Sequence, residues 1–294
     1  MLDKEELRKL ISTVATSLGK DAVFIEKDYY QTLMLQKISN ISEKLVFKGG
    51  TSLSKCYKLI NRFSEDIDIS AKCKLTEGER RRFYHAIIDS AAEIGLSFPD
   101  TTKTKSKRLY NRFEFEYESA VTNGLDSLII ETNYDVPVYP IRVMKIPDFI
   151  GDYFESYELE VPTELGLVPL KMNVQEPIRT FIDKVFALCD YHIKNEQAGH
   201  SRHMYDITVL FSMMKINDEF TELFAKVREE RSHSIMSPSA AYEIDLQELF
   251  LEVINDEVYK KDYENVTMHL IYEHKPYIEV QKTLQDIYKT GFLK

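Results

Sequence analysis

The sequence predicts an α/β fold of the α+β type, in which a twisted mixed sheet with flanking helices is followed by an α-helical C-terminal domain. Residues 45–70 read as a strand, a glycine turn, a helix and a second strand. The stretches 109–118 and 127–134 alternate apolar and polar residues with the period of strands. After Val174 the apolar residues follow helical spacing only, so we expect domains at 1–174 and 175–294.

The composition is that of a soluble globular protein. Hydrophobic residues make up 44% and charged residues 29% of the 294 positions, and no apolar run is long enough to predict a membrane-spanning helix. The first residues, MLDKEELRKLIS, are charged and predict a helix rather than a signal peptide. The odd number of scattered cysteines favours a reducing, cytoplasmic environment and gives no metal-ligand spacing: Cys56, Cys73 and Cys189.

The net charge of −10 argues against a wide nucleic-acid footprint, because such a footprint needs many phosphate contacts. The average hides a basic cluster at Arg80–Arg82 and a basic stretch at 103–112 without an acidic residue: Lys103, Lys105, Lys107, Arg108 and Arg112. This stretch is compatible with a tRNA or nucleotide substrate. A solvated face of the protein is the alternative.

Two helices are expected before the first strand. Apolar residues recur with a helical period across 3–18 and again across 21–39. The second stretch contains EKDYY at 26–30, which we interpret as part of an amphipathic helix with charged shoulders, without assigning it any chemistry.

The glycine turn has the features of a phosphate-binding loop. Gly49 and Gly50 can adopt backbone angles that a Cβ atom forbids, so the chain can approach a phosphate closely. The unpaired N–H groups of the following helix would then point at the anion. The alternative is a simple turn with a helix cap. We expect the helix to carry on one side Leu53, Cys56, Tyr57 and Ile60.

Asp66 and Asp68 lie two residues apart in the next strand, so both side chains project from one face. Two like charges side by side repel, and a divalent metal would reverse that penalty. Hard oxygen ligands at this spacing suit Mg²⁺, which also bridges nucleotide phosphates. Alone, Asp66 and Asp68 also fit a solvated edge strand, but the combination of glycine turn, helix and paired carboxylates is more specific.

Glu131 stands out among the later elements. Thr76 and Glu79 have the pattern of a capping box and predict the start of a helix. After this helix we expect the two alternating strands and then extended segments at 140–150 and 167–174. Glu131 is a carboxylate in an otherwise apolar strand, where burying an unpaired charge is costly. A nearby metal or cation would explain it, and an edge-strand glutamate facing water is the alternative.

Two helices of the C-terminal part carry the remaining candidates. Lys184 lies off the apolar stripe of 176–194, and Tyr205 and Asp206 lie within 203–214. Lys184 could neutralise nucleotide phosphates or the leaving pyrophosphate, and Asp206 could orient it or act on the attacking hydroxyl. An inter-helix salt bridge without a catalytic part is the alternative.

These motifs resemble one family. GGTSLSK followed by RFSEDIDIS is similar to the core motif of the nucleotidyltransferase superfamily, and more narrowly to the AbiEii/AbiGii-type toxins, the enzymatic halves of type IV toxin–antitoxin systems. EKDY resembles a segment that precedes the core in these toxins, and FIDKVFAL and the YD at 205–206 resemble their later motifs. Asp183 stands where the family usually has glutamate, and either Arg202 or His203 stands for its basic residue.

The resemblance implies a nucleotidyltransferase-like first domain and a set of site residues. The implied metal ligands include Glu131, which sits where the family places a third carboxylate: Asp66, Asp68 and Glu131. The implied nucleotide-binding residues are Gly49, Gly50, Thr51, Ser52, Lys55, Arg62 and Ser64. The implied catalytic residues are the three carboxylates together with Lys184 and Asp206, which would work with the first domain across the boundary.

The reaction implied by the resemblance is transfer of a nucleoside monophosphate from an NTP to an acceptor hydroxyl, with release of pyrophosphate. Mg²⁺ or Mn²⁺ would be the cofactor, and tRNA or another macromolecule the acceptor. A cognate antitoxin that acts genetically or controls the toxin would be the partner. Modification of a protein side chain or of a small molecule such as an aminoglycoside stays open. A non-catalytic nucleotide-binding module also stays open, although the complete carboxylate set argues against it.

Overall fold

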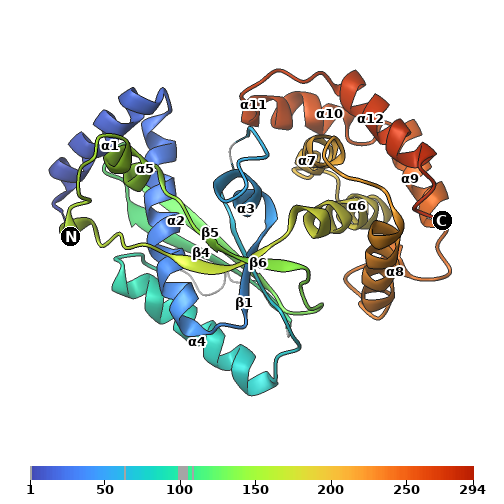
Figure 1. Cartoon of the computed structure of the whole chain (residues 1–294), viewed down its shortest axis with the longest axis horizontal. Helices are drawn as coiled ribbons and strands as arrows, with labels where there is room; N and C mark the ends of the chain where they lie inside the picture. Colours follow the sequence, from blue (N-terminus) through green and yellow to red (C-terminus); the bar gives the residue numbers. More distant parts are fainter. Residues whose placement is uncertain (1, 63, 99–104, 108) are drawn as a thin grey trace. The chain divides into compact units, whose positions relative to one another are not determined.

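The computed structural model describes residues 2–62, 64–98, 105–107 and 109–294. The chain forms two compact units: Met1–Tyr57 with Ser64–Gln175, and Lys58–Phe63 with Glu176–Lys294. We call the first the sheet unit and the second the helical unit, and Figure 1 shows the elements of both. The segment Lys58–Phe63 belongs to the helical unit, although the chain on both sides of it belongs to the sheet unit.

Seven strands form one mixed sheet in the part of the chain that the structure describes. They are β1 (Leu45–Lys48), β2 (Ile67–Ala71), β3 (Lys105–Lys107), β4 (Tyr110–Glu118), β5 (Leu125–Asn133), β6 (Ile141–Lys145) and β7 (Lys171–Gln175). Their order is β3-β4-β5-β2-β1-β7-β6, and the β1–β7 and β2–β5 pairs are parallel while the others are antiparallel. The strands β2 and β5 are therefore neighbours in the interior of the sheet.

The two alternating stretches of the sequence form β4 and β5, as predicted. Phe113 and Phe115 of β4 and Leu128 and Ile130 of β5 are fully buried, whereas the residues between them are partly exposed. The antiparallel register places Phe113 opposite Ile130 and Phe115 opposite Leu128. Because these pairs share one face, a slip of one residue would expose the whole apolar set.

The sheet unit has five α-helices in its described residues: α1 (Lys4–Leu18), α2 (Ala22–Ile41), α3 (Gly49–Lys55), α4 (Glu77–Glu93) and α5 (Phe149–Ser156). The capping box predicted for α4 is confirmed, since the Thr76 side chain accepts from the Glu79 N–H and the Glu79 carboxylate accepts from the Thr76 N–H. Asp3 and Glu6 form a second capping box at α1. Such caps typically contribute about 1 kcal/mol.

The helical unit is built from α6 (Pro177–Ile193), α7 (Arg202–Phe211), α8 (Asp218–Ser232), α9 (Leu246–Asn255), α10 (Lys260–Asp262), α11 (Met268–Leu270) and α12 (Tyr277–Lys289). Four rings pack together in its core with centroid distances of 4.9–6.4 Å: Phe181, Phe220, Phe224 and Phe292. Aromatic pairs at such distances stabilise a core beyond the area that they bury. In the described part of the chain, no helix has the length and apolar character that crossing a membrane requires.

The helix after the glycine turn is shorter than predicted. It has seven residues, and Cys56, Tyr57 and Ile60 lie beyond its end. The backbone leaves the helical conformation at Lys58, whose φ is 54°, and continues into the helical unit as Lys58–Phe63. The prediction that these residues share one face of a helix with Leu53 was therefore wrong. The chain does not continue α3, because the segment Lys58–Phe63 packs with the helical unit.

The segments predicted as extended at 140–150 and 167–174 are strands only in part. β6 covers Ile141–Lys145, and β7 begins only at Lys171. Asp148 accepts a hydrogen bond from the Gly151 N–H and caps α5, so a helix begins inside the first segment. The capping side chain decides the local structure there, and the sequence analysis did not use that signal.

Candidate active site

Gly49 joins β1 to α3, at the point where Lys48 of β1 pairs with Asp68 of β2. Its φ of 77° lies in the left-handed region that favours glycine. A Cβ atom at this position would lie 1.9 Å from Oδ2 of Asp68, so the carboxylate rests against the glycine backbone. Glycine is required here both by the backbone conformation and by the space that Asp68 occupies.

Asp66, Asp68 and Glu131, here named the carboxylate cluster, lie near one another on two neighbouring strands. Asp66 precedes β2, Asp68 lies in β2, and Glu131 of β5 is the parallel-register partner of Asp68. The pKa of Glu131 is raised to about 7, first by burial and then by the negative charges of Asp68 and Asp66. Contacts with Tyr110 and Arg112 lower it again, but less strongly.

The interpretation of Glu131 as an edge-strand residue was wrong. β5 lies between β4 and β2, and the Glu131 side chain is 31% exposed. Arg112 on β4 approaches it, with 3.5 Å between Nε and the nearer carboxylate oxygen, and also pairs with Glu114 at 3.1 Å. Since the pKa of Glu131 is still raised, burial and neighbouring negative charge outweigh this shared guanidinium.

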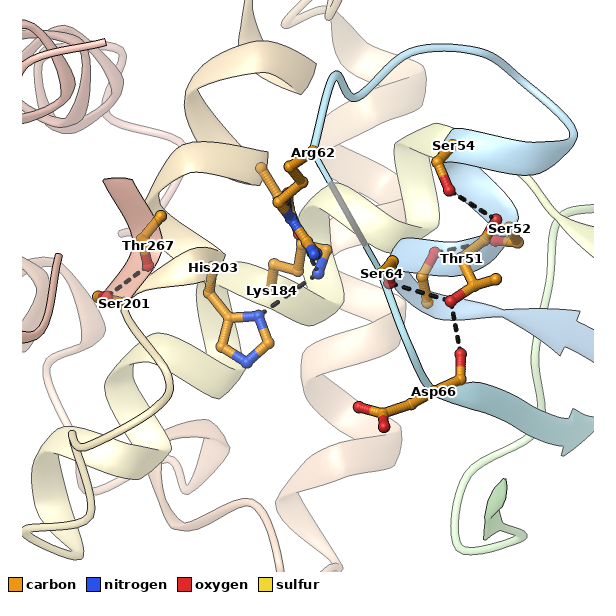
Figure 2. Close-up of polar contacts among 12 residues, drawn as sticks. Thr51, Ser52, Ser54, Arg62, Ser64, Asp66, Lys184, Ser201, His203 and Thr267 are labelled. Atoms are coloured by element: carbon orange, nitrogen blue, oxygen red, sulfur yellow. Dashed lines mark hydrogen bonds and ion pairs between the residues drawn. The ribbon is translucent and has the colours of Figure 1, made fainter. Parts of the chain in front are cut away.

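Side chains hold the backbone that leads to Asp66. The Thr51 hydroxyl of α3 donates to the Asp66 carbonyl at 2.5 Å and shares a further hydrogen bond with the Ser64 hydroxyl at 2.9 Å (Figure 2). The Gln31 amide of α2 donates to the Glu65 carbonyl at 2.9 Å and to the Ser64 carbonyl at 3.4 Å. Thr51 and Ser64, which were predicted to bind the nucleotide, thus help to order the segment that carries Asp66.

The serine hydroxyls of α3 bond within the helix. Ser52 donates to the Gly49 carbonyl at 2.9 Å, and Ser54 donates to the Thr51 carbonyl at 3.1 Å (Figure 2). Lys48 precedes the helix and makes no capping hydrogen bond with its side chain. What the first turn of α3 offers to an anion is therefore mainly its backbone N–H groups.

Lys55, the next predicted nucleotide-binding residue, lies in a buried ion pair. Its side chain is 5% exposed and pairs with Asp28 of α2. Asp28 also accepts a hydrogen bond from the Phe149 N–H at 3.0 Å, which ties the start of α5 to the same carboxylate. A nucleotide phosphate would have to displace Asp28 before it could bind the Lys55 ammonium.

Arg62, Lys184 and Asp206, here named the buried ion cluster, lie together in the helical unit. Arg62 donates through Nε and Nη2 to both Asp206 oxygens at 2.7 Å, and the Lys184 ammonium lies 2.7 Å from one of them. Burial would raise the pKa of Asp206, but the charges of Arg62 and Lys184 hold it well below its ordinary value. Burial lowers the pKa of Lys184, and Asp206 opposes that effect.

The guanidinium of Arg62, predicted to bind the nucleotide, is thus directed at Asp206. Its backbone is anchored in the same unit, because Arg62 forms an antiparallel bridge with Ile271 and the Tyr272 N–H donates to the Asn61 carbonyl at 3.0 Å. The predicted inter-helix salt bridge between Lys184 and Asp206 is present, and Arg62 makes it a three-residue cluster.

His203 adds a neutral partner to Lys184. Its Nδ1 atom lies 3.4 Å from the Lys184 ammonium. Figure 2 marks this contact with a dashed line. Burial lowers the pKa of His203 well below its ordinary value and the Lys184 charge lowers it further, so the imidazole is neutral and can accept a hydrogen bond. Its ring is parallel to those of Tyr191 and His200, which stack at 3.6 Å.

The sequence analysis missed the part that α2 plays in the sheet unit. Glu26 is fully buried and accepts hydrogen bonds of 2.6 Å from the Ser119 hydroxyl and the Ala120 N–H, so the charged-shoulder interpretation of EKDYY was wrong. Lys27 is 7% exposed and pairs with Asp126 at 3.0 Å. No local signal predicts this burial, because three consecutive charged residues span about 200° of a helix, which is an ordinary width for a solvated polar face.

The carboxylate cluster fits a divalent cation by its chemistry. Carboxylate oxygens are the ligands that Mg²⁺ and Mn²⁺ prefer, and a cation would relieve the repulsion that raises the pKa of Glu131. Among the residues that the structure describes, no three His, Cys, Asp or Glu side chains are already arranged to hold a metal ion. The fit therefore rests on donor type and charge rather than on a preformed cage.

The basic stretch at 103–112 falls partly outside the described residues. Lys103 and Arg108 are not among them, and only the backbone of Lys105 and Lys107 is described, as part of β3. Arg112 is described, and its guanidinium contacts Glu114 and Glu131. RNA binding through this stretch stays a prediction.

The fold is similar to that of a nucleotidyltransferase toxin of known structure. MenT4, the nucleotidyltransferase toxin Rv2826c from Mycobacterium tuberculosis H37Rv, aligns with a TM-score of 0.55 and 17% identity over 96% of this chain and 89% of its own. JHP933 from Helicobacter pylori aligns with a TM-score of 0.45 and 19% identity over 90% of this chain and 93% of its own. A comparison with curated protein sequences found no significant match.

The sequence itself matches a family model over residues 33–289, described as nucleotidyl transferase AbiEii toxin of type IV toxin–antitoxin systems. The match contains both clusters and the glycine turn, and it spans most of the 294 residues. It begins within α2, after the EKDYY segment. The chain therefore belongs to the AbiEii family, and it is a nucleotidyltransferase toxin of a type IV toxin–antitoxin system.

Proposed function

We propose that this enzyme moves a nucleoside monophosphate from an NTP to a hydroxyl of an acceptor macromolecule, with tRNA or another RNA as the acceptor. The observation that carries the proposal is the carboxylate cluster, which lies on two adjacent strands beside a glycine turn. Asp66, Asp68 and Glu131 would hold Mg²⁺ or Mn²⁺. When bound, the cation neutralises the charge of the triphosphate and of the leaving pyrophosphate.

The glycine turn would receive the triphosphate. Gly49 and Gly50 have no side chain that would keep a phosphate at a distance, and the first N–H groups of α3 can donate to its oxygens. Thr51 and Ser52 would contribute backbone N–H groups, since their hydroxyls already form hydrogen bonds within the sheet unit. Positioning of this kind supplies much of the catalysis in phosphoryl and nucleotidyl transfer.

Glu131 is suited to either of two tasks. It would complete the metal site with Asp66 and Asp68, or it would accept the proton of the attacking hydroxyl as a general base. Its register position opposite Asp68 supports both tasks, because either one requires a carboxylate beside the other two.

Lys184 would neutralise charge on the nucleotide phosphates or on the pyrophosphate as it leaves. Its ammonium lies 2.7 Å from Asp206, so, like that of Lys55, it would have to turn from this carboxylate to bind a phosphate. Arg62 pairs with the same carboxylate.

The variant Asp66→Asn tests the metal site. Asparagine keeps the volume of the side chain but removes a charged ligand, so we expect labelled transfer to fall to background. The melting temperature should stay the same or rise, because one of three neighbouring negative charges is gone. The measurement is incubation with each labelled NTP, Mg²⁺ and total RNA or lysate, followed by identification of the labelled macromolecule.

The matched control for this experiment is Asp89→Asn, which makes the same chemical change on the exposed face of α4. This control should transfer label at the normal rate. Normal turnover in Asp66→Asn would remove the carboxylate cluster from the reaction, whatever the control does.

Alanine substitution of four basic residues tests the RNA acceptor: Lys103, Lys105, Lys107 and Arg108. If they contact RNA phosphates, RNA affinity should fall and the slope of log K against log salt should flatten by up to about 3, because fewer counterions are released. NTP binding should persist. A control with the same charge change replaces exposed lysines of the helical unit: Lys215, Lys226, Lys261 and Lys282.

Growth assays connect this chemistry to toxicity. Expression of the chain alone should slow bacterial growth, a cognate antitoxin should relieve the effect, and both Asp66→Asn and the four-residue basic variant should lose toxicity. Growth arrest that survives Asp66→Asn would show that nucleotidyl transfer is not its cause. A basic variant that stays toxic would move the acceptor elsewhere and favour a protein or small-molecule acceptor.

A further inference from the structure

Five buried polar residues of α2 bind other segments of the sheet unit through their side chains: Glu26, Lys27, Asp28, Gln31 and Gln36. Glu26 contacts the β4–β5 connection and Asp28 contacts α3, while Lys27 pairs with Asp126 of β5 and, at 3.8 Å, with the Glu65 side chain. Gln31 differs from them, because it donates to the backbone carbonyls of the two residues immediately before Asp66. The molecule thus connects a buried helix directly to the segment that leads to a predicted metal ligand.

Three successive carbonyls on this segment each accept a hydrogen bond from a side chain. Gln31 donates to those of Ser64 and Glu65, and Thr51 donates to that of Asp66. The regular strand β2 begins only at Ile67, so Asp66 lies ahead of the paired register of the sheet. These side chains therefore hold the backbone of Asp66 at a point where the hydrogen bonds between strands have not yet begun.

The position of Asp66 needs such support, because its neighbours repel it. Asp68 is the register partner of Glu131, and Asp66 precedes Asp68 by two residues, so negative charges gather here and repel one another. A carboxylate on a loosely held segment would turn toward water and away from the other two. A rigid backbone keeps the oxygen ligands together before a cation arrives, which is how supporting residues strengthen a metal site.

We propose that Gln31 is a positioning residue of the metal site, which fixes the backbone ahead of Asp66 so that its carboxylate stays beside Asp68 and Glu131. The inference rests on the proposed function, since it takes the carboxylate cluster to be the cation site. Gln31 acts through the peptide groups of Ser64 and Glu65, and its buried side chain is only 3% exposed.

The same helix offers a matched control. Gln36 is also buried, at 8% exposed, and its amide donates to the Val168 carbonyl at 2.8 Å. Val168 lies just before β7, in a segment that carries no member of the carboxylate cluster. Loss of either amide removes a hydrogen bond to a backbone carbonyl, but only loss of the Gln31 amide frees the segment of Asp66.

The experiment compares Gln31→Met with Gln36→Met in the full chain. Methionine has a similar length and cannot donate a hydrogen bond, so the packing is largely kept. Each variant is titrated with Mn²⁺ alone, free ion being counted by electron paramagnetic resonance, and its melting temperature is measured without metal. We expect Gln31→Met to bind Mn²⁺ about tenfold more weakly than the wild type, and Gln36→Met to bind it normally.

Both variants should lower the melting temperature by similar amounts, so a difference confined to Mn²⁺ affinity cannot come from general loss of stability. If Gln31→Met does not fold, Gln31→Asn replaces it, because its amide is one methylene too short to reach the carbonyls. The apparent Mg²⁺ constant for transfer should rise by the same factor of about ten, with the rate largely restored at saturating metal.

Equal Mn²⁺ affinity in Gln31→Met and the wild type would overturn the proposal, as would an equal loss in Gln31→Met and Gln36→Met. The variant Asp66→Asn separates this failure from failure of the proposed function. Mn²⁺ binding that Asp66→Asn leaves unchanged would contradict the metal site itself, and the Gln31 proposal would fall with it. Binding that depends on Asp66 but not on Gln31 would contradict the Gln31 proposal alone.

Discussion

Two carboxylates, Glu131 in the sheet unit and Asp206 in the helical unit, have pKa values that move in opposite directions. The pKa of Glu131 is raised to about 7 by burial and by the charges of Asp68 and Asp66, although its side chain is 31% exposed. The pKa of Asp206 lies well below its ordinary value, although its side chain is fully buried. The more deeply buried acid is therefore the one that stays ionised, because its partners outweigh its burial.

The comparison separates two kinds of polar cluster. The buried ion cluster compensates its own negative charge, so it can stabilise the native helical unit as long as it stays complete. At Glu131 in the carboxylate cluster, negative charge and burial dominate, which costs stability and favours a cation. The predictions below test this difference, from the largest expected effect to the smallest.

Asp206→Asn should give the largest loss of stability. It leaves the charges of Arg62 and Lys184 buried without their shared carboxylate, and breaking a buried pair in this way costs about 3–5 kcal/mol. Denaturant unfolding followed by circular dichroism measures the change, since the chain has no tryptophan. In contrast, Asp66→Asn should not lower the free energy of unfolding. Equal losses in the two variants would remove the distinction between the clusters.

The pH dependence gives a second test of Asp206. Its pKa is lower in the folded than in the unfolded chain, so its contribution to stability is complete above the unfolded value of about 4 and is lost as the pH falls further. Unfolding measured between pH 5 and pH 3 should show a loss in the wild type that is smaller in Asp206→Asn. An unchanged acid profile in that variant would contradict the assigned ionisation of Asp206.

Gly49→Ala should lower the free energy of unfolding by about 2–3 kcal/mol, because alanine disfavours the left-handed backbone and its Cβ atom meets the Asp68 carboxylate. Transfer activity should fall with it. The control Gly78→Ala has open space around its Cβ position and lies in α4, so it should raise stability by up to about 1 kcal/mol. If Gly49→Ala behaves like this control, Asp68 does not pack against the glycine.

Lys184→Met should have the smallest effect on stability, within about 1 kcal/mol. It leaves Arg62 and Asp206 as a compensated pair, and the lowered pKa of Lys184 shows that burial already disfavours its charge. Transfer should nevertheless be lost if Lys184 neutralises phosphate charge. A stability loss as large as that of Asp206→Asn would mean that the ammonium is essential to the cluster. Normal transfer would remove Lys184 from the reaction.

Features that depend on a few neighbouring residues could be predicted from the sequence. Thr76 and Glu79 form their capping box because the partners are three residues apart in one turn of chain. The alternation of β4 and β5 predicts their buried faces, because successive side chains of a strand point to opposite sides. The pairing of Asp68 with Gly49 and Glu131 was harder to foresee, since it depends on the register between strands.

The sequence by itself determined the mixed α/β fold, the family and the types of residue at the candidate site, because these depend on periodicity and on motifs of adjacent residues. Only the tertiary structure decided that Arg62 pairs with Asp206 and Lys55 with Asp28. It also decided that Gln31 binds the backbone just before Asp66. Each of these contacts joins residues at least 27 positions apart. The residues next to a charged or polar side chain in the sequence do not predict its partner. Its role therefore depends on which groups the fold brings within hydrogen-bond distance.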